Sequence, residues 1–177
     1  MDDAALVEAL REHAYLEGDF VLRSGQRSSY YLDKYRFETV PELLEVLGAR
    51  LAAKIAEVEP EAVRLACPEL GAVTLAAAAS LASRLPFLIV RGEAKAYGTA
   101  NRIEGAFEQG ELVALVEDIV TSGGAAADAV RAVRQAGLEC RTAICVIDRE
   151  EGGVDALGRL GVRLHPLLRA AQIVHGR

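Results

Sequence analysis

The sequence has no long run of apolar residues, although 51% of its 177 residues are hydrophobic. The longest apolar stretch, residues 72–81, is interrupted by Thr74 and Ser80 and is far shorter than the roughly 20 residues that cross a bilayer. No membrane helix is therefore expected. The acidic start Met1-Asp2-Asp3 is the reverse of a secretory signal, so we expect the protein to stay in the cytosol.

Positive charge, proline and cysteine are also scarce. The chain has 20 Lys and Arg residues against 26 Asp and Glu residues, which argues against nucleic acid as a main partner because binding phosphates needs a basic surface. Only five prolines occur, and a chain of this length and apolar content can build one domain with a sizeable core. Cys67, Cys140 and Cys145 lack any CxxC or Cys/His spacing and are interpreted as reduced, buried thiols rather than zinc ligands.

Strand-like and helix-like segments alternate along the chain. The apolar patterns predict helices over residues 4–16, 39–55, 72–84, 125–135 and 154–160 and strands over 20–22, 30–32, 63–67, 87–90, 112–116, 142–147 and 162–164. This alternation predicts an α/β fold with a central, mainly parallel sheet flanked by helices. Residues 91–109 are the exception, because they form a long polar stretch with three glycines, which is typical of a functional lid.

Helix starts are predicted at two places. Asp2 and Asp3 are candidate caps for the first helix, and Thr39 with Glu42 predicts a capping-box start for the second. Leu44 and Leu47 should then lie on the buried face of that second helix.

The strongest chemical signal is the segment LVALVEDIVTSGGA, residues 112–125. It reads as a buried strand, an acid pair at its carboxyl end, and a turn rich in hydroxyl groups and glycine that opens a helix. The hydroxyls of Thr121 and Ser122 and the exposed amides of the helix can surround a phosphate, and Gly123 allows close backbone approach. Glu117 and Asp118 can accept hydrogen bonds from two sugar hydroxyls. The segment therefore predicts a ribose 5-phosphate site.

The alternative for this segment is an ordinary strand–turn–helix junction, in which the acids are solvated and Thr121 or Ser122 caps the helix. Neither GxGxxG nor GxxxxGK[ST] is present, so a dinucleotide site or an ATP-type phosphate loop is disfavoured.

Residues 112–125 resemble the signature by which type I phosphoribosyltransferases bind phosphoribosyl pyrophosphate (PRPP). Four other segments, in the same order along the chain, resemble parts of the orotate phosphoribosyltransferases. Residues 20–33 look like the amino-terminal segment over the base, 68–71 like the pyrophosphate loop, 91–105 like the catalytic loop, and 146–153 like the segment whose arginine meets the orotate carboxylate.

The resemblance implies a single domain over residues 1–177 with the type I phosphoribosyltransferase fold, in which about residues 1–36 form a small N-terminal hood. It implies transfer of the phosphoribosyl group of PRPP to orotate, which yields orotidine 5′-monophosphate and pyrophosphate for pyrimidine nucleotide synthesis. Mg²⁺ is expected through PRPP, with no metal ligand assigned directly. A homodimer is also implied, in which loop 91–109 reaches the neighbouring active site.

The resemblance also implies roles for individual residues. The implied PRPP-binding residues are Glu117, Asp118, Thr121, Ser122, Gly123, Gly124, Ala125, Glu69, Leu70 and Gly71. The implied base-binding residues are Arg149, Thr121, Arg23, Tyr30 and Tyr31. The implied catalytic residues are Lys95, Arg91 and Asp118.

Structural roles are the alternatives for several of these side chains. Arg149 could be a solvated charge in a turn, Arg23 could pair with a surface acid, and Tyr30 and Tyr31 could be ordinary strand residues. The acids within residues 57–59 and 150–151 are expected on solvated faces.

Some positions depart from the family's pattern. Gly92 stands where the catalytic loop commonly has lysine, and Tyr97 replaces its usual histidine. Cys67 and Ala72 occupy positions that are usually glycine, so they are expected to hinder the approach of a phosphate. The hypothesis is that PRPP binding survives, whereas orotate turnover depends on whether these changes are tolerated. A phosphoribosyltransferase for another base, or a PRPP- or nucleotide-sensing protein with little catalysis, are the alternatives.

Overall fold

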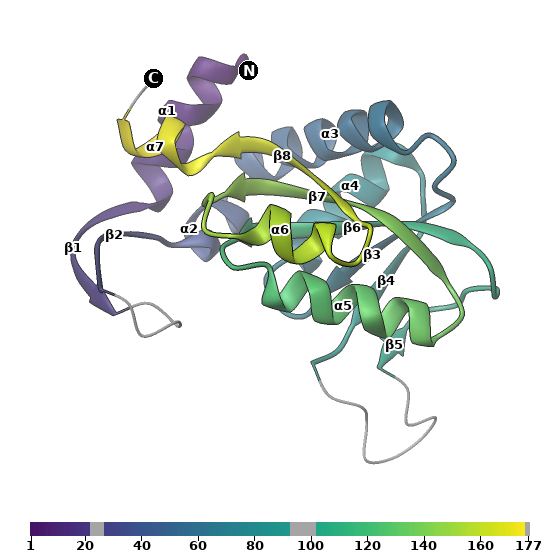
Figure 1. Cartoon of the computed structure of the whole chain (residues 1–177). Coiled ribbons are helices and arrows are strands. Elements are labelled where there is room, and N and C mark those ends of the chain that lie inside the picture. Colours follow the sequence, from purple (N-terminus) through teal and green to yellow (C-terminus); the bar gives the residue numbers. More distant parts are fainter. Residues whose placement is uncertain (22–26, 93–101, 176–177) are drawn as a thin grey trace.

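The protein, seen here as a computed structural model, forms a six-stranded sheet between two layers of helices (Figure 1). The structure describes residues 1–21, 27–92 and 102–175. The strand order is β5-β4-β3-β6-β7-β8, and only β5 runs antiparallel to its neighbour. The strands are β3 (Arg64–Pro68), β4 (Phe87–Val90), β5 (Ile103–Glu104), β6 (Leu112–Val120), β7 (Glu139–Asp148) and β8 (Arg163–Arg169). The predicted fold class is therefore confirmed.

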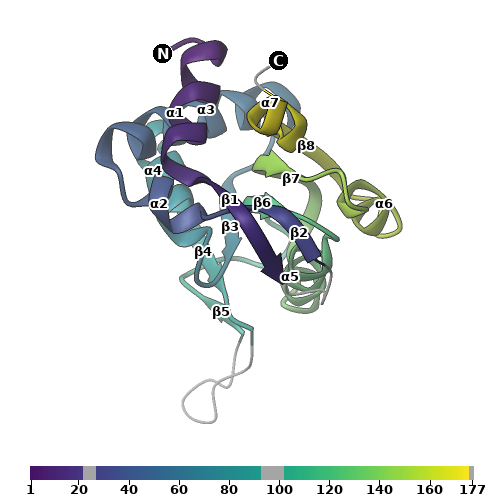
Figure 2. The same cartoon turned by 90° about the vertical axis from the view of Figure 1, so that its left-hand side faces the viewer.

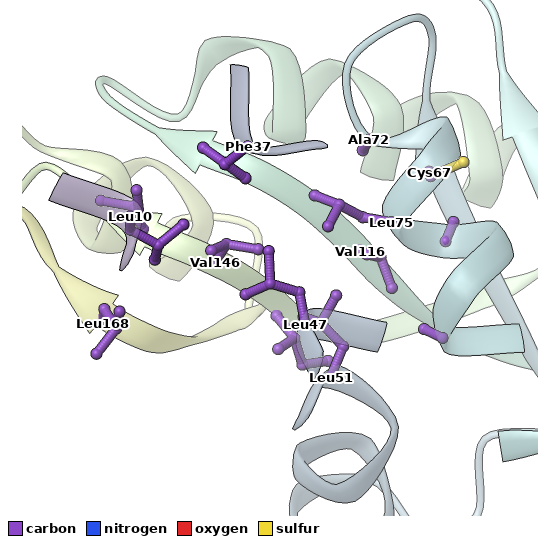
Figure 3. Packing of buried hydrophobic residues seen from close by; sticks show 14 of the residues in the cluster. Leu10, Phe37, Leu47, Leu51, Cys67, Ala72, Leu75, Val116, Val146 and Leu168 are labelled. Atoms are coloured by element: carbon purple, nitrogen blue, oxygen red, sulfur yellow. The ribbon is translucent and has the colours of Figure 1, made fainter. Parts of the chain in front are cut away.

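Helices cover both faces of this sheet. On one side lie α1 (Asp3–Ala14), α2 (Lys34–Glu38), α3 (Pro41–Val58), α4 (Val73–Ser83) and α7 (Ala170–His175), and on the other lie α5 (Gly124–Gln135) and α6 (Gly153–Gly158). Figure 3 shows Leu47 and Leu51 of α3 beside Val116 of β6 and Val146 of β7. This cluster also contains Leu10 of α1, so one continuous core joins the N-terminal helix to the sheet.

The first two strands stand apart from the main sheet. β1 (Tyr15–Val21) and β2 (Arg27–Leu32) form an antiparallel pair, and Arg27 Nε donates a hydrogen bond to Asp19 Oδ1 at 3.0 Å. Figures 1 and 2 place this hairpin at the edge of the sheet toward which β7 and β8 point. A hood at this edge can cover ligands bound at the carboxyl ends of the strands.

Several local expectations need correction. Asp2 does cap α1, since its Oδ1 accepts a hydrogen bond from the Ala5 amide at 2.9 Å, but the helix ends at Ala14. The predicted capping box is wrong. Val40 is the N-cap of α3, without a side-chain bond, because Thr39 closes the short helix α2 and donates its hydroxyl to Tyr35 O at 2.6 Å.

The burial of two residues, Leu44 and Glu59, also differs from what the sequence predicted. Leu43 is the first buried residue of α3 and shares its face with Leu47 at a spacing of four, whereas Leu44 is only half-buried against the same core. Glu59 is only 3% exposed, not solvated. It accepts hydrogen bonds from Arg141 Nε at 3.0 Å and Thr142 Oγ1 at 2.8 Å, which tie the end of α3 to the start of β7.

Candidate functional site

The sheet reverses its direction of winding between β3 and β6. β4 lies outside β3 on one side, and β7 lies outside β6 on the other. Open α/β sheets bind ligands at such a switch point, beyond the carboxyl ends of the strands. The loop after β3 contains residues 69–71, and the turn after β6 contains residues 121–123, so the topology brings together two segments that the sequence assigned to PRPP.

The acid pair lies inside β6 and not after it, because the strand continues to Val120. Glu117 and Asp118 are 5% and 3% exposed, so the alternative of solvated acids is wrong. Glu117 Oε2 accepts a hydrogen bond from the Asp118 amide at 3.3 Å, and Asp118 Oδ1 accepts one from the Ile119 amide. Burial and, next, the charge of Asp118 raise the pKa of Glu117, so Glu117 keeps its proton to a higher pH than an exposed glutamate does.

Lys34 completes this acid cluster and was missed by the sequence reasoning. Its Nζ forms an ion pair with Asp118 Oδ2, and it lies on α2 directly after the hood hairpin. Glu38, one helical turn further on, is 2% exposed, and burial followed by the charge of Asp118 raises its pKa to about 8. The only available sequence signal was a lysine next to Asp33, and nothing in its spacing indicates a partner 84 residues away.

Gly71 brings the predicted pyrophosphate loop against this cluster. A Cβ atom at Gly71 would overlap Asp118 Oδ2 and Lys34 Nζ, so only glycine permits this approach. Glu69 anchors the loop on its other side, because its Oε1 accepts a hydrogen bond from the Gly92 amide at 3.0 Å. Leu70, between them, is 71% exposed.

Cys67 and Ala72, expected to hinder phosphate binding, turn away from the loop surface. Both are buried in the hydrophobic core, where Figure 3 shows them near Leu75. Cys67 Sγ donates to Leu88 O at 3.5 Å, and burial raises the pKa of this thiol to about 12. These side chains fill core positions beneath the loop, and their hindrance of a phosphate stays a prediction. Cys140 and Cys145 are also buried free thiols, as predicted.

Arg91 lies at the base of the predicted catalytic loop. Its Nη1 is 3.9 Å from Glu69 Oε2 and 3.9 Å from Glu104 Oε1. The Arg91 amide donates to Arg102 O at 2.7 Å, and Arg102 Nε donates to Arg91 O at 3.0 Å, so two bonds close the base of the segment. Lys95 and Tyr97 lie outside the described residues.

The predicted phosphate cup is the turn between β6 and α5. Gly123 is the N-cap of α5 at φ +76°, and no side chain caps this helix, so the alternative that Thr121 or Ser122 caps it is wrong. A Cβ atom at Gly123 would be 3.0 Å from the Cα of Gly153, which shows how closely the cup packs on the segment after β7. Ser122 is exposed, as are Gly124 and Ala125 at the start of α5, where backbone amides lack intrahelical partners.

Arg149 connects the end of β7 to the hood. Its amide donates to Val120 O at 2.9 Å, and its guanidinium carbon lies 5.0 Å from the centroid of the Tyr30 ring. Its Nε donates to Glu151 Oε1 at 2.9 Å, and its side chain is only 7% exposed. A solvated charge is therefore excluded, and Glu151 serves as its partner instead of being merely solvated.

The two predicted tyrosines point to opposite faces of β2, as strand alternation requires. Tyr30 is half-buried between Arg149 and Tyr15, with the tyrosine ring centroids 5.9 Å apart. Tyr31 is 41% exposed and packs on Phe20 at 5.6 Å. The structure thus brings Tyr30, but not Tyr31, to Arg149, and Arg23 lies outside the described residues.

Other kinds of site find little support. Across residues 1–21, 27–92 and 102–175, no group of three or more His, Cys, Asp or Glu residues could hold a metal ion. In the same described part of the chain, no helix is both long and apolar enough to span a bilayer. A hollow of about 530 Å³ lies between the C-terminal ends of α3 and α4, lined mostly by alanine, and it contains none of the predicted site residues.

Comparisons with known proteins agree with this geometry. No protein-family model matches the chain. The sequence is 44% identical over 174 residues to the orotate phosphoribosyltransferase of Methanocella arvoryzae, and the match covers 97% of each chain. The structure is similar to that of orotate phosphoribosyltransferase from Aeropyrum pernix, with a TM-score of 0.86, 31% identity and 97% coverage of each chain. It is also similar to the Mycobacterium tuberculosis enzyme in complex with PRPP, with a TM-score of 0.80, 28% identity and coverage of 97% of this chain and 98% of that one.

Proposed function

This chain belongs to the orotate phosphoribosyltransferase family, and we propose that it transfers the 5-phosphoribosyl group of PRPP to orotate. The products are orotidine 5′-monophosphate and pyrophosphate, and the reaction belongs to pyrimidine nucleotide biosynthesis. The observation that carries this proposal is the meeting of Asp118, the turn after β6 and Arg149 at one edge of the sheet, where Arg149 N is 2.9 Å from Val120 O. An acid pair, a phosphate cup and a buried cation are the groups that a phosphorylated ribose and a carboxylated base require.

PRPP is proposed to lie across the switch point of the sheet. Glu117 and Asp118 accept hydrogen bonds from the two ribose hydroxyls, and residues 121–125 surround the 5-phosphate with backbone amides and hydroxyls. The start of α5 supports this role, because the positive end of the helix dipole attracts a phosphate. The pyrophosphate lies on residues 69–71, whose backbone approaches Asp118 at Gly71.

Orotate is proposed to bind between this site and the hood. Arg149 and Thr121 hold its carboxylate, with Tyr30 beside the arginine and Tyr31 and Arg23 contributing from the hood. Since Nε of Arg149 is engaged by Glu151, the two terminal nitrogens are left to form paired hydrogen bonds with a carboxylate. The contact with Tyr30 keeps the guanidinium plane in position for that contact.

The reaction breaks the bond between ribose C1 and the pyrophosphate oxygen, and the electron pair of that bond leaves with pyrophosphate. A ring nitrogen of orotate bonds to C1, and its proton passes to the departing pyrophosphate or to water. The ribose becomes oxocarbenium-like, so the enzyme's main task is electrostatic stabilisation. We assign this task to Asp118 near the ribose and to Arg91 and Lys95 near the leaving pyrophosphate. Anchoring of Arg91 beside Glu69 supports its placement at the pyrophosphate loop.

A magnesium ion fits this site as part of the substrate complex. The oxygens of Asp118 are already engaged by Lys34 and a backbone amide, which suits an ion held mainly by PRPP oxygens and water, the usual arrangement for Mg²⁺ with phosphates. When bound, it would supply positive charge to the pyrophosphate.

We further propose that residues 1–177 act as one domain with residues 1–36 as the hood. The enzyme is proposed to work in the cytosol as a homodimer, with loop 91–109 reaching the partner's active site. Mixing the inactive variants Asp118→Asn and Lys95→Ala tests the shared site. In an equal mixture, half of the dimers are hybrids, and one of the two sites in each hybrid keeps both residues. About a quarter of wild-type activity should therefore be recovered. A mixture that stays inactive would refute the exchange.

Orotate consumption, followed by ultraviolet absorbance with purified protein, PRPP and Mg²⁺, tests the activity itself. Turnover should fall by about a hundredfold or more in Asp118→Asn, as for loss of another positioned electrostatic contact. Absence of turnover in the wild-type protein, despite calorimetric binding of PRPP, would reject orotate as substrate and favour another base or a sensing role.

A further inference from the structure

Lys34 lies between the part of the proposed site that holds the ribose and the part that holds the pyrophosphate, which are the two groups joined by the bond that breaks. Its Nζ pairs with Asp118 Oδ2 in β6, and the same nitrogen borders Gly71 in the loop after β3, where an added Cβ would overlap it. Lys34 reaches this position from α2, at the end of the hood segment, and it is not among the residues given a binding or catalytic role above. No other Lys or Arg in residues 1–21, 27–92 and 102–175 forms an ion pair with Asp118.

The surroundings of Lys34 favour a charged ammonium with hydrogen bonds to spare. Burial lowers its pKa, but the nearby Asp118 charge raises it, and the net effect is a rise. The side chain is 31% exposed, whereas that of Asp118 is 5% exposed, so the lysine reaches the pair from the solvent side. An ammonium has three donors, and its contact with Asp118 uses one of them. The nitrogen that carries the other two borders Gly71 and lies 5.3 Å from the centroid of the Tyr35 ring, which takes no conventional hydrogen bond from it.

We propose that Lys34 is a further catalytic residue, which contacts the pyrophosphate of PRPP from within the same subunit while remaining paired with Asp118. This inference rests on the proposed function and adds a role for a residue that the proposed function does not use. As the bond to C1 breaks, its electron pair moves onto the pyrophosphate oxygen, and the Lys34 ammonium stabilises that charge. The lysine keeps its proton throughout, so it acts as a fixed positive charge and not as a general acid.

The chain supplies a matched control for this lysine. Lys54 on α3 has a side chain 30% exposed, against 31% for Lys34, and it also forms an ion pair, with Glu57 at 2.7 Å. Lys34→Met and Lys54→Met therefore remove the same charge from equally exposed positions, of which only one borders the proposed site. Lys34→Arg keeps the charge, and thermal unfolding of each variant reports whether it folds.

Calorimetry with three ligands separates pyrophosphate contact from support of Asp118. Lys34→Met should weaken binding of Mg²⁺–PRPP and Mg²⁺–pyrophosphate by about 10- to 100-fold, the effect expected for one hydrogen bond to a charged group. Binding of ribose 5-phosphate, which lacks the pyrophosphate, should change by less than about threefold. Lys34→Arg should retain most of the affinity, and Lys54→Met should behave as the wild type.

Equal weakening of ribose 5-phosphate and PRPP in Lys34→Met would overturn the proposal, because Lys34 would then act only by holding Asp118. Unchanged binding of all three ligands would overturn it as well. If Lys34→Met does not fold, Lys34→Gln takes its place in the same comparison. Failure of the wild-type protein to consume orotate would reject the proposed activity, whereas the three-ligand comparison decides the role of Lys34 independently.

Discussion

Glu38 is a buried carboxyl group whose charge should oppose folding at alkaline pH. It is 2% exposed, and its Oε1 is buried without a hydrogen-bond partner among the described residues. Burial and the neighbouring Asp118 raise its pKa to about 8. Replacing it in the variant Glu38→Gln removes the titrating group but keeps the shape of the side chain.

The sign of the effect follows from proton linkage. In the unfolded chain a glutamate has a pKa of about 4.3, so the folded state binds the proton more tightly than the unfolded state does. The stabilisation from this proton is fully present below about pH 4.3 and is lost as pH rises through about 8. At about 1.4 kcal/mol per pKa unit, the loss across the whole window is at most about 5 kcal/mol.

Between pH 5 and pH 8.5, the free energy of unfolding of Glu38→Gln should therefore rise by about 4 kcal/mol relative to wild type, because a small part of the window lies below pH 5. Urea denaturation at both pH values measures this difference. Glu45→Gln, at an exposed position of α3, serves as the control and should show almost no change. A difference between wild type and Glu38→Gln that is the same at both pH values would refute the raised pKa.

Four other substitutions test three separate parts of the structure. Glu59→Gln should lower the free energy of unfolding by about 2 kcal/mol, because it weakens charge-assisted bonds to a buried carboxylate. Orotate turnover should stay unchanged, since Glu59 meets the opposite end of β7 from Arg149. Urea unfolding and turnover of one sample check this, and a loss of activity at unchanged stability would contradict it. Arg149→Ala should raise the KM for orotate by about 10- to 100-fold but leave the affinity for PRPP nearly unchanged. Steady-state kinetics measures both, and an equal effect on the two substrates would argue against a contact between Arg149 and orotate. Tyr30→Ala should raise the orotate KM more than Tyr31→Ala, because only Tyr30 contacts Arg149, and the reverse order would show that the exposed face of the hood binds the base.

The sequence by itself predicted the features that adjacent residues encode. Alternation of apolar strands and amphipathic helices indicated the layered α/β fold, and residues 112–125 identified the strand, turn and helix that form the proposed phosphate cup. These predictions succeeded because a strand–turn–helix junction depends on local backbone preferences. The five-residue helix α2 was not foreseen, since it is too short to show a helical period, and its presence moved Thr39 out of its predicted capping role.

Only the tertiary structure decided which distant residues meet. It paired Lys34 with Asp118, placed Gly71 against both, and buried Glu59 where a solvated face was predicted. It also turned Cys67 into the core, away from the surface of the pyrophosphate loop. The spacing of residues cannot show such contacts, because the partner of a charge and the direction of a side chain after a strand depend on the order of strands in the sheet and on the packing of loops at its edge.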